Sequence, residues 1–377
     1  MNRKGVFMAK FNWKSIVGWG VAIAVIFGII GYNAYQEHLK SQTDKKRVYA
    51  ILPITGGFAF QGKEEQKTMQ VWMQNHPNAP FELEILDNES NPTKSLTLAQ
   101  RAAMNDDSPL FIVPTGAMGY PILPKLKEMN GFMILSPSTK EEDGTYKEFQ
   151  RISFGSADMN KPLIDYVSSG KTVVIMHSND MAGHTGATKT EETLTKNGAK
   201  VVEKLAFDTK ELDMRIITLK AMSYKSDIIF VISPPTIGFI NVIKELKTQE
   251  YPGVVLSDPA LRTPSVVSQL GKNADGVYTS VMPTERIYKE YPEVAKALTE
   301  NGLELYNFPI NIWDIMDVVN HFVSNDIPFT QDEFLKMKKW HGISGDIEFT
   351  ENGNSSYPFV LSIVKDGKFI PVESEDK

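Results

Sequence analysis

The sequence predicts an α/β protein with two lobes, each built on a parallel sheet flanked by helices, preceded by one transmembrane helix. First, short apolar runs typical of buried strands alternate regularly with amphipathic helical stretches. Second, the alternation restarts midway, so that two blocks of similar size occupy residues 48–150 and 160–280. Third, an uncharged apolar stretch lies near the N-terminus.

The composition excludes several classes of protein. Hydrophobic residues make up 42% of the 377-residue chain and charged residues 23%, which is ordinary for a folded globular protein. The net charge of −6 offers no electrostatic attraction for nucleic acid. Because the chain contains no cysteine, disulfides, thiolate metal sites and cysteine nucleophiles are excluded.

The N-terminal stretch predicts a membrane anchor at residues 15–36, because a bilayer core needs about 20 apolar residues. Residues 1–14 carry basic side chains and should stay in the cytoplasm, and residues 37–47 form a polar linker. The alternative is a cleaved signal peptide. Its cleavage site would be poor, since Tyr32 stands where a small residue is preferred. We therefore expect an uncleaved anchor or signal in the cytoplasmic (inner) membrane, crossing once, with the folded domain in the periplasm or outside the cell.

The first block opens with a strand at Val48–Leu52, which is apolar without alternation, as in a sheet buried on both faces. A loop rich in proline and glycine follows at residues 53–62, and a helical pattern begins at Lys63. The block continues with strand Phe81–Asp87, a helix begun by Asn91-Pro92, strand Leu110–Val113, a helix with Ile122, Leu123, Leu126 and Met129 turned inward, and strand Phe132–Leu135.

The second block repeats this order and then changes character. Its predicted elements are strands Thr172–His177, Lys200–Phe207, Ile228–Ile232, Val254–Leu256 and Val277–Ser280, and helices Thr185–Asn197, Leu212–Met222 and one with an inward stripe of Ile237, Ile240, Ile243 and Leu246. After Pro283 the pattern predicts helices Tyr288–Glu300 and Pro309–Ser324, and a third begun by a capping box at Thr330 and Glu333. The C-terminal part predicts antiparallel strands with turns at residues 351–353 and 366–367.

The loop Gly57–Lys63 matches the spacing G-x-x-x-x-G-K of a phosphate-binding loop between a strand and a helix. The next residue is Glu64, where a serine or threonine would hold magnesium, and Glu65 adds a second carboxylate. Repulsion between these carboxylates and phosphate favours a plain glycine-rich loop that enters a helix.

Other chemical motifs are incomplete. The six histidines show no zinc-binding spacing, and no G-x-S-x-G elbow for a nucleophilic serine is present. The stretch Asp87–Asn91 resembles the start of a calcium loop, but Pro92 replaces the required glycine. We therefore expect no enzyme, no metal site and no cofactor.

Several predicted strand exits are rich in glycine, serine, threonine and proline. They lie at residues 55–62, 115–119, 136–140, 178–183 and 233–236. Free backbone N–H groups beside hydroxyls suit a carboxylate or another small polar ligand. Asp258, at a further exit, either pairs with an ammonium group or caps the turn before Pro259.

Three blocks resemble the leucine-binding-protein-like solute-binding proteins of branched-chain amino acid ABC importers. They are the strand, loop and helix at residues 51–72 (ILPITGGFAFQGK…), the stretch 85–139 that ends in ILSPST, and the closing strands 342–372 (GISGDIEF…VKDGKF). The resemblance implies the type I periplasmic-binding fold, with two Rossmann-like lobes joined by a three-strand hinge. On this basis, lobe 1 comprises residues 48–157 and 282–328, and lobe 2 comprises residues 158–281 and 329–372.

The resemblance also implies a ligand site with departures. The family's carboxylate-binding hydroxyls align near Ala117-Met118 and Ser138–Lys140, and two family aromatics align near Ala182 and Ser233–Pro235, which lack them. Asp258 matches the acidic residue that pairs with the amino group. The expected ligand-binding residues are Gln61, Thr115, Gly116, Ala117, Ser138, Thr139, Asp180, Pro234 and Asp258.

These features lead to two functional hypotheses. The first is an extracytoplasmic solute-binding protein that passes a small polar ligand (amino acid, amide or small acid) to an ABC permease. The second is a membrane-tethered sensor or accessory domain of the same fold that signals or binds a protein partner. Neither hypothesis involves nucleic acid.

Overall fold

The structure, a computed structural model, describes residues 45–136 and 144–372. The expected cytoplasmic segment, membrane anchor and most of the linker therefore lie outside the described residues. No helix in the part of the chain that the structure describes is long and apolar enough to cross a bilayer. Apart from Lys46, the elements below belong to one compact unit.

The first sheet forms lobe 1 and has the strand order β2-β1-β3-β4-β5, with β1, β3, β4 and β5 paired in parallel. Its strands are β1 (Lys46–Leu52), β2 (Phe81–Asp87), β3 (Leu110–Val113), β4 (Phe132–Leu135) and β5 (Phe149–Arg151). In β1, Val48 and Ala50 face one hydrophobic core, and Tyr49 and Ile51 face another. Burial of both faces explains why the sequence of β1 is apolar without alternation.

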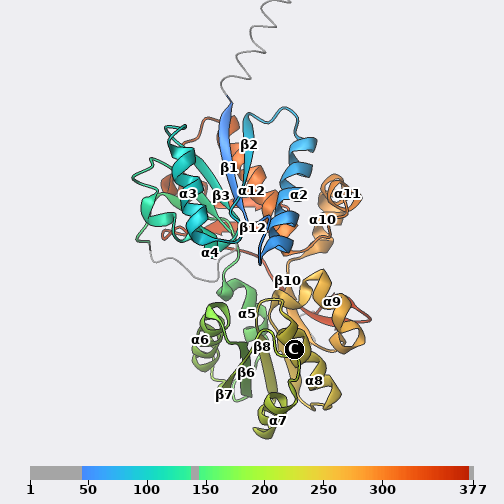
Figure 1. Cartoon of the computed structure of the whole chain (residues 1–377). Coiled ribbons are helices and arrows are strands. Elements are labelled where there is room, and N and C mark those ends of the chain that lie inside the picture. Colours follow the sequence, from blue (N-terminus) through green and yellow to red (C-terminus); the bar gives the residue numbers. More distant parts are fainter. Residues whose placement is uncertain (1–44, 137–143, 373–377) are drawn as a thin grey trace, which may run out of the picture. The chain divides into compact units, whose positions relative to one another are not determined.

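Two layers of helices cover this sheet (Figure 1). Residues of α2 and α12 pack with Val48 and Ala50, whereas residues of α3 and α4 pack with Tyr49 and Ile51. The helices that accompany this sheet are α2 (Ala59–Asn75), α3 (Pro92–Ala103), α4 (Gly116–Gly119), the 3-10 helix η1 (Leu123–Lys125), α10 (Thr284–Glu290), α11 (Pro292–Glu300), α12 (Asn307–Ser324) and α13 (Gln331–Met337).

The second sheet forms lobe 2 and has the order β15-β14-β10-β9-β8-β6-β7, with an antiparallel edge made by β14 and β15. Its strands are β6 (Thr172–Ser178), β7 (Lys200–Phe207), β8 (Ile228–Ile232), β9 (Val254–Ser257), β10 (Tyr278–Val281), β14 (Val360–Lys365) and β15 (Lys368–Pro371). Its helices are α5 (Ser156–Tyr166), α6 (Met181–Lys196), α7 (Arg215–Ser223), α8 (Ile237–Thr248), the 3-10 helices η2 (Pro259–Arg262) and η3 (Gly271–Ala274), and α9 (Pro264–Leu270). Hydrophobic cores lie on both of its faces, as in lobe 1.

A small third sheet, β11-β12-β13, belongs with lobe 1. Its strands are β11 (Lys339–Gly342), β12 (Gly345–Phe349) and β13 (Ser355–Ser356). Phe334 of α13 stacks on Phe132 and Phe322, and Phe349 joins the same core. The assignment of residues 329–372 to lobe 2 is therefore wrong for α13 and this sheet, because their aromatic side chains are buried in lobe 1.

Two predicted helices are also corrected. The stretch Tyr288–Glu300 forms two helices, α10 and α11, because Pro292 supplies no N–H group to continue the first. The helix expected around residues 122–129 is reduced to α4 and η1, in a segment that contains Pro121 and Pro124. The inward side chains were nevertheless predicted correctly, since Ile122, Leu123 and Leu126 are buried and the partly buried Met129 packs against the same core.

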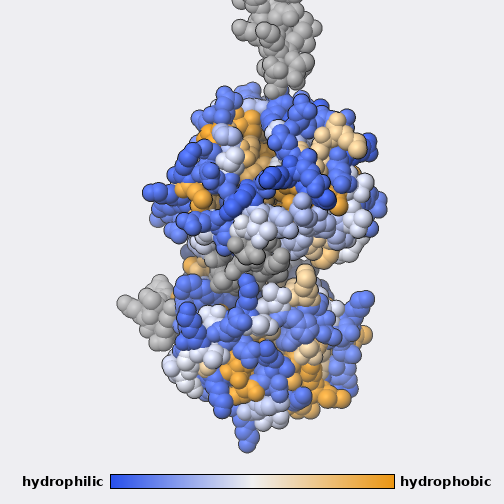
Figure 2. Space-filling view, turned by 90° about the vertical axis from the view of Figure 1, so that its left-hand side faces the viewer, coloured by the Kyte–Doolittle hydropathy of each residue, from blue (hydrophilic) through white to orange (hydrophobic). Residues whose placement is uncertain are grey.

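Three chain connections lead from one lobe to the other. They are residues 152–155 between β5 and α5, residues 282–283 between β10 and α10, and residues 357–359 between β13 and β14. The face of the protein seen in Figure 2 is largely hydrophilic with separate hydrophobic patches. Most of the large apolar side chains in the described residues lie in the cores, and single exposed ones are common on folded proteins.

Candidate functional site

The loop after β1 is held against the exit of β2. The carboxylate of Asp87 accepts hydrogen bonds from the backbone N–H groups of Ile54 (3.1 Å) and Thr55 (3.2 Å) and from the Thr55 hydroxyl (2.8 Å). Burial acts to raise the pKa of Asp87, but bonds from Glu89, Thr55 and Ile54 outweigh it and lower the pKa. These hydrogen bonds favour the charged carboxylate of Asp87 and hold the loop after β1 in place.

Gln61 and Thr115, two of the expected ligand-binding residues, meet at the adjacent exits of β1 and β3. The Gln61 amide Nε2 donates to the carbonyl of Pro114 at 3.0 Å and to the Thr115 hydroxyl at 3.3 Å. It also donates to Glu65 at 2.7 Å. The sequence indicates Glu65 only as a carboxylate that repels phosphate, and its contact with Gln61 is visible only in the structure.

The chain passes from the end of β3 into α4 within a few residues. Thr115 and Gly116 are buried and Ala117 is partly buried, so this exit offers mainly backbone groups. At the neighbouring β4 exit, the buried Ser136 hydroxyl bonds to Asn311 of α12. Ser138 and Thr139, which were expected to contribute hydroxyls, lie outside the described residues.

In lobe 2, Asp180 follows β6 and caps α6. Its carboxylate accepts from the backbone N–H of Gly183 at 2.8 Å and from the Ser178 hydroxyl at 3.0 Å. Gly183 is required here, because a Cβ atom would lie 2.2 Å from the Ser178 carbonyl. Asp180 thus shapes a strand exit, and only part of its carboxylate remains for a ligand.

Asp258 performs the same task at the exit of β9. One carboxylate oxygen accepts from the Ser233 N–H at 3.1 Å and the other from the Ala260 N–H at 3.2 Å. Burial raises the pKa of Asp258 to about 7. Pro234 lies next to Ser233, and its backbone carbonyl accepts a hydrogen bond from the Ser233 hydroxyl at 2.8 Å. The interpretation of Asp258 as a turn cap is therefore confirmed. Because each carboxylate oxygen can accept two hydrogen bonds, Asp258 can still accept one from an ammonium group.

Four exposed apolar side chains at these exits were missed. Phe58 (46% exposed) and Phe60 (51%) begin α2, Met181 (67%) begins α6, and Ile237 (38%) begins α8. Each follows the carboxyl end of a parallel strand, where ligands of such sheets bind. The available signal was the sequence GFAF, which places two phenylalanines in a glycine-rich loop.

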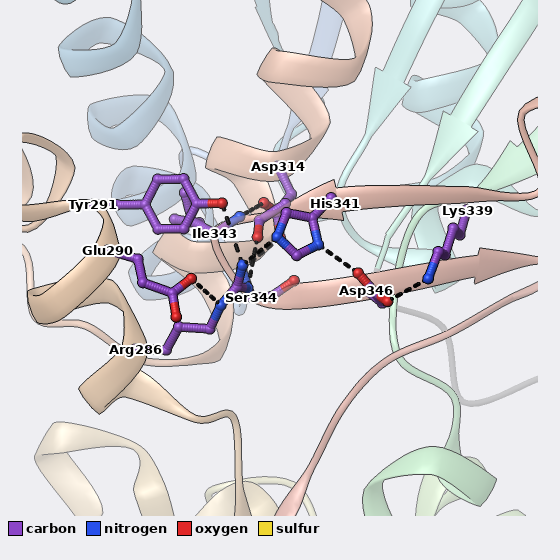
Figure 3. A network of polar contacts seen from close by, with 10 residues as sticks. Arg286, Glu290, Tyr291, Asp314, Lys339, His341, Ile343, Ser344 and Asp346 are labelled. Carbon is purple, nitrogen blue, oxygen red and sulfur yellow. Dashed lines mark hydrogen bonds and ion pairs between the residues drawn. The ribbon is translucent and has the colours of Figure 1, made fainter.

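A polar network holds the connection after β10 (Figure 3). Arg286 of α10 donates to the Gly342 carbonyl at 3.0 Å and to His341 at 2.7 Å, and it pairs with Glu290. Because the guanidinium stays protonated, His341 accepts through Nε2 and bonds Asp346 through Nδ1. The network therefore fixes α10 to the β11–β12 hairpin, beside a segment that joins the lobes.

Solved structures with low sequence identity share this fold. A solute-binding protein of an ABC transporter from Rhodopseudomonas palustris BisB5, in complex with 3,4-dihydroxybenzoic acid, is 20% identical with a TM-score of 0.70, covering 87% of this chain and 96% of its own. The leucine-binding protein LivK from Thermotoga maritima MSB8 is 19% identical with a TM-score of 0.72, covering 87% and 98%. LivJ from Streptococcus pneumoniae, in complex with isoleucine, is 17% identical with a TM-score of 0.71, covering 86% and 98%.

Sequence comparison gives the family. A search of the curated proteins finds no match. A family model described as "Periplasmic binding protein" matches residues 47–305, which is more than half of the chain. The matched proteins are solute-binding proteins and not enzymes. With this match and the two-lobed α/β fold, the chain belongs to the family of periplasmic binding proteins, leucine-binding-protein-like in architecture.

Proposed function

We propose that this protein captures a small molecule outside the cytoplasm, at the strand exits of its two sheets, and passes it to an ABC permease. The mechanism is capture: the ligand docks on one lobe, and closure of the hinge adds contacts from the other. The proposed ligand is an amino acid, an amide or a small acid. The proposed contacts are Gln61, Thr115, Gly116, Ala117, Ser138, Thr139, Asp180, Pro234 and Asp258.

The observation that carries this proposal is the convergence of polar groups at adjacent strand exits. Gln61 and Thr115 meet in lobe 1, and Asp258 meets Ser233 beside Pro234 in lobe 2. Ligands of open α/β sheets bind just beyond the carboxyl ends of the strands. A few fixed polar groups in such a place orient a small ligand.

The exposed Phe58, Phe60, Met181 and Ile237 refine the ligand class. They favour a ligand that combines an apolar body with a polar head, because each side chain gains by covering apolar surface. The ligands named for two structural relatives, isoleucine and 3,4-dihydroxybenzoic acid, both have this character. Asp258 is the proposed partner of an amino group, if the ligand carries one.

We further propose that residues 15–36 form a single-pass anchor in the inner membrane. The binding domain would then lie in the periplasm or outside the cell. Sequencing of the mature N-terminus tests this part. A mature chain that retains residue 15 agrees with an anchor, and a chain that starts beyond Ala34 contradicts it.

A thermal-shift screen of residues 45–377 against amino acids, amides and small acids tests the capture function. A ligand present at 100 times its Kd should stabilise the protein by about 2.7 kcal/mol. We expect at least one compound to raise the melting temperature in a saturable way. Failure of the whole set would contradict capture of this ligand class.

The second candidate is a tethered sensor or accessory domain that uses the same ligand site without transport. The uncharged stretch at residues 15–36 is the observation that favours it, since a tether suits a fixed signalling partner. Co-purification separates the two: a permease captured in a ligand-dependent way supports transport, and a kinase or cyclase supports sensing.

A further inference from the structure

A cavity of about 680 Å³ lies beside the segment that follows β10. Its walls include Val267 of α9, Met282 of the connection to α10, Val360 at the start of β14 and Phe369 of β15. None of the expected ligand-binding residues lines it. Its volume is in the range of small-molecule sites, and its walls are largely apolar, as such sites usually are.

Arg262 is the least exposed of the charged residues that line this cavity. Its side chain is only 19% exposed, and its guanidinium lies 4.9 Å from the centre of the Phe369 ring. Burial lowers the pKa of Arg262, although an arginine remains charged at any physiological pH. A buried cation of this kind needs a partner to offset its lost hydration.

The described residues do not provide a hydrogen-bond acceptor for every N–H donor of Arg262. The Nη2 group donates to the Leu305 carbonyl at 2.9 Å. The paired carboxylate, Glu304, lies 4.0 Å from Nη1, beyond hydrogen-bonding distance, and its side chain is 62% exposed. A guanidinium has five N–H donors in a planar fork that matches a carboxylate.

The other charged residues that line the cavity are Glu285, Glu304 and Lys368. All three are exposed, so water screens their charges more than that of the less exposed Arg262. The buried Arg262 therefore decides which ligand charge is preferred. Apolar walls with one buried guanidinium are complementary to a molecule with one carboxylate on an apolar body.

We propose that this cavity is a second small-molecule site, distinct from the strand exits, which binds an apolar monocarboxylate through Arg262. The ligand would rest its apolar body on Val267, Val360 and Phe369 and touch Met282 in the chain connection between the lobes. It would thereby contact a segment that any hinge motion has to move.

The test uses the full chain in a non-ionic detergent, titrated calorimetrically with cyclohexanecarboxylate. Its neutral isostere, cyclohexanecarboxamide, serves as the matched ligand. We expect saturable binding of the acid, and binding of the amide that is weaker by roughly tenfold or more. Arg262→Gln should weaken binding of the acid to the same degree. Arg215→Gln, which changes an exposed arginine of the same lobe, should leave the affinity for the acid unchanged.

Two further variants keep the test decisive. Ser268→Trp places an indole at the mouth of the cavity, leaves Arg262 intact and should abolish binding even if Arg262→Gln fails to fold. Phe60→Asp alters the proposed strand-exit site and should not change the affinity for cyclohexanecarboxylate. The proposal is overturned if the wild type does not bind the acid, if acid and amide bind equally, or if Ser268→Trp binds as the wild type does. Loss of binding in Phe60→Asp alone would assign the acid to the strand exits instead.

Discussion

The side-chain amide of Gln61 donates a 2.7 Å hydrogen bond to Glu65, one turn later on α2. Glu65 is 1% exposed, and burial raises the pKa of its carboxyl group well above the usual value. Among the described residues, its second oxygen has no hydrogen-bond partner. Burial therefore favours the neutral acid form of Glu65 over the carboxylate, behind the first wall of the proposed ligand site.

Glu65→Gln should be tolerated, because a neutral amide replaces a neutral acid of the same shape. We expect a change in the free energy of unfolding of less than about 1 kcal/mol near pH 6, measured by urea unfolding. Glu65→Ala should cost about 2–3 kcal/mol, since it opens a cavity and removes a partner of Gln61. Equal losses in the two variants would show that Glu65 acts as a charged group.

Gly62→Ala tests the close approach of α2 to the end of β1. A Cβ atom at this position would lie 2.3 Å from the backbone carbonyl oxygen of Pro53. We expect a loss of about 1–3 kcal/mol in urea unfolding, although alanine favours helices. The matched control is Gly57→Ala, where no atom lies within 4 Å of the added Cβ, so its effect should stay within about 1 kcal/mol. A stabilised Gly62→Ala protein would refute the predicted clash.

One buried hydrogen bond joins α2 to α12 beside their shared hydrophobic core. The indole Nε1 of the fully buried Trp72 donates to Asp317 at 2.7 Å. Asp317→Ala should cost about 1–3 kcal/mol because it leaves a buried N–H group unpaired, whereas Asp317→Asn retains an acceptor and should cost less. Urea unfolding followed by circular dichroism measures both, and an Asn variant as unstable as the Ala variant would contradict the assignment.

The strands could be predicted from the sequence because each central strand is buried on both faces and reads as an apolar run. β1, β2 and β3 agree with the prediction to within two residues, and the strand-helix alternation places Thr115 and Asp258 at strand exits. These statements need only local pattern and the geometry of parallel sheets.

The contacts within the site could not be predicted, because they join residues distant in the chain. Gln61 meets Thr115 across 54 positions, and Asp87 holds Thr55 across 32. The placement of α13 failed for the same reason. Its amphipathic pattern predicts a buried face, but only the stacking of Phe334 on Phe132 shows which lobe buries it.

Asp314 predicts a pH dependence of stability. It accepts the backbone N–H of Ile343 at 2.7 Å, and burial raises its pKa to about 7. An unfolded aspartate has a pKa of about 3.9. Between these values the folded protein holds a proton that the unfolded chain has lost, so the free energy of unfolding falls as the pH rises from about 4 to about 7. Asp314→Asn should flatten this slope in urea unfolding across the same range.

Asp213 serves as a control, because its pKa is shifted in the opposite direction to that of Asp314. Its carboxylate is paired with Arg215, whose hydrogen bonds lower the pKa of Asp213 to about 2. Its stabilising contribution is present above a pH of about 4 and is lost only as the pH falls toward 2, so Asp213→Asn should not change the slope between pH 4 and 7. An Asp314→Asn slope equal to that of the wild type would contradict the raised pKa.

The affinity of the screened ligand for Phe60→Ser tests the central claim most directly, because Phe60 lies at the strand-exit site and is 51% exposed. The control is Ile216→Ser on α7, whose side chain is 85% exposed and which is none of the proposed contacts. By isothermal titration, capture at the strand exits predicts that Phe60→Ser binds roughly tenfold more weakly, while Ile216→Ser binds as the wild type does. Equal affinities in all three proteins would place the ligand elsewhere and contradict the account.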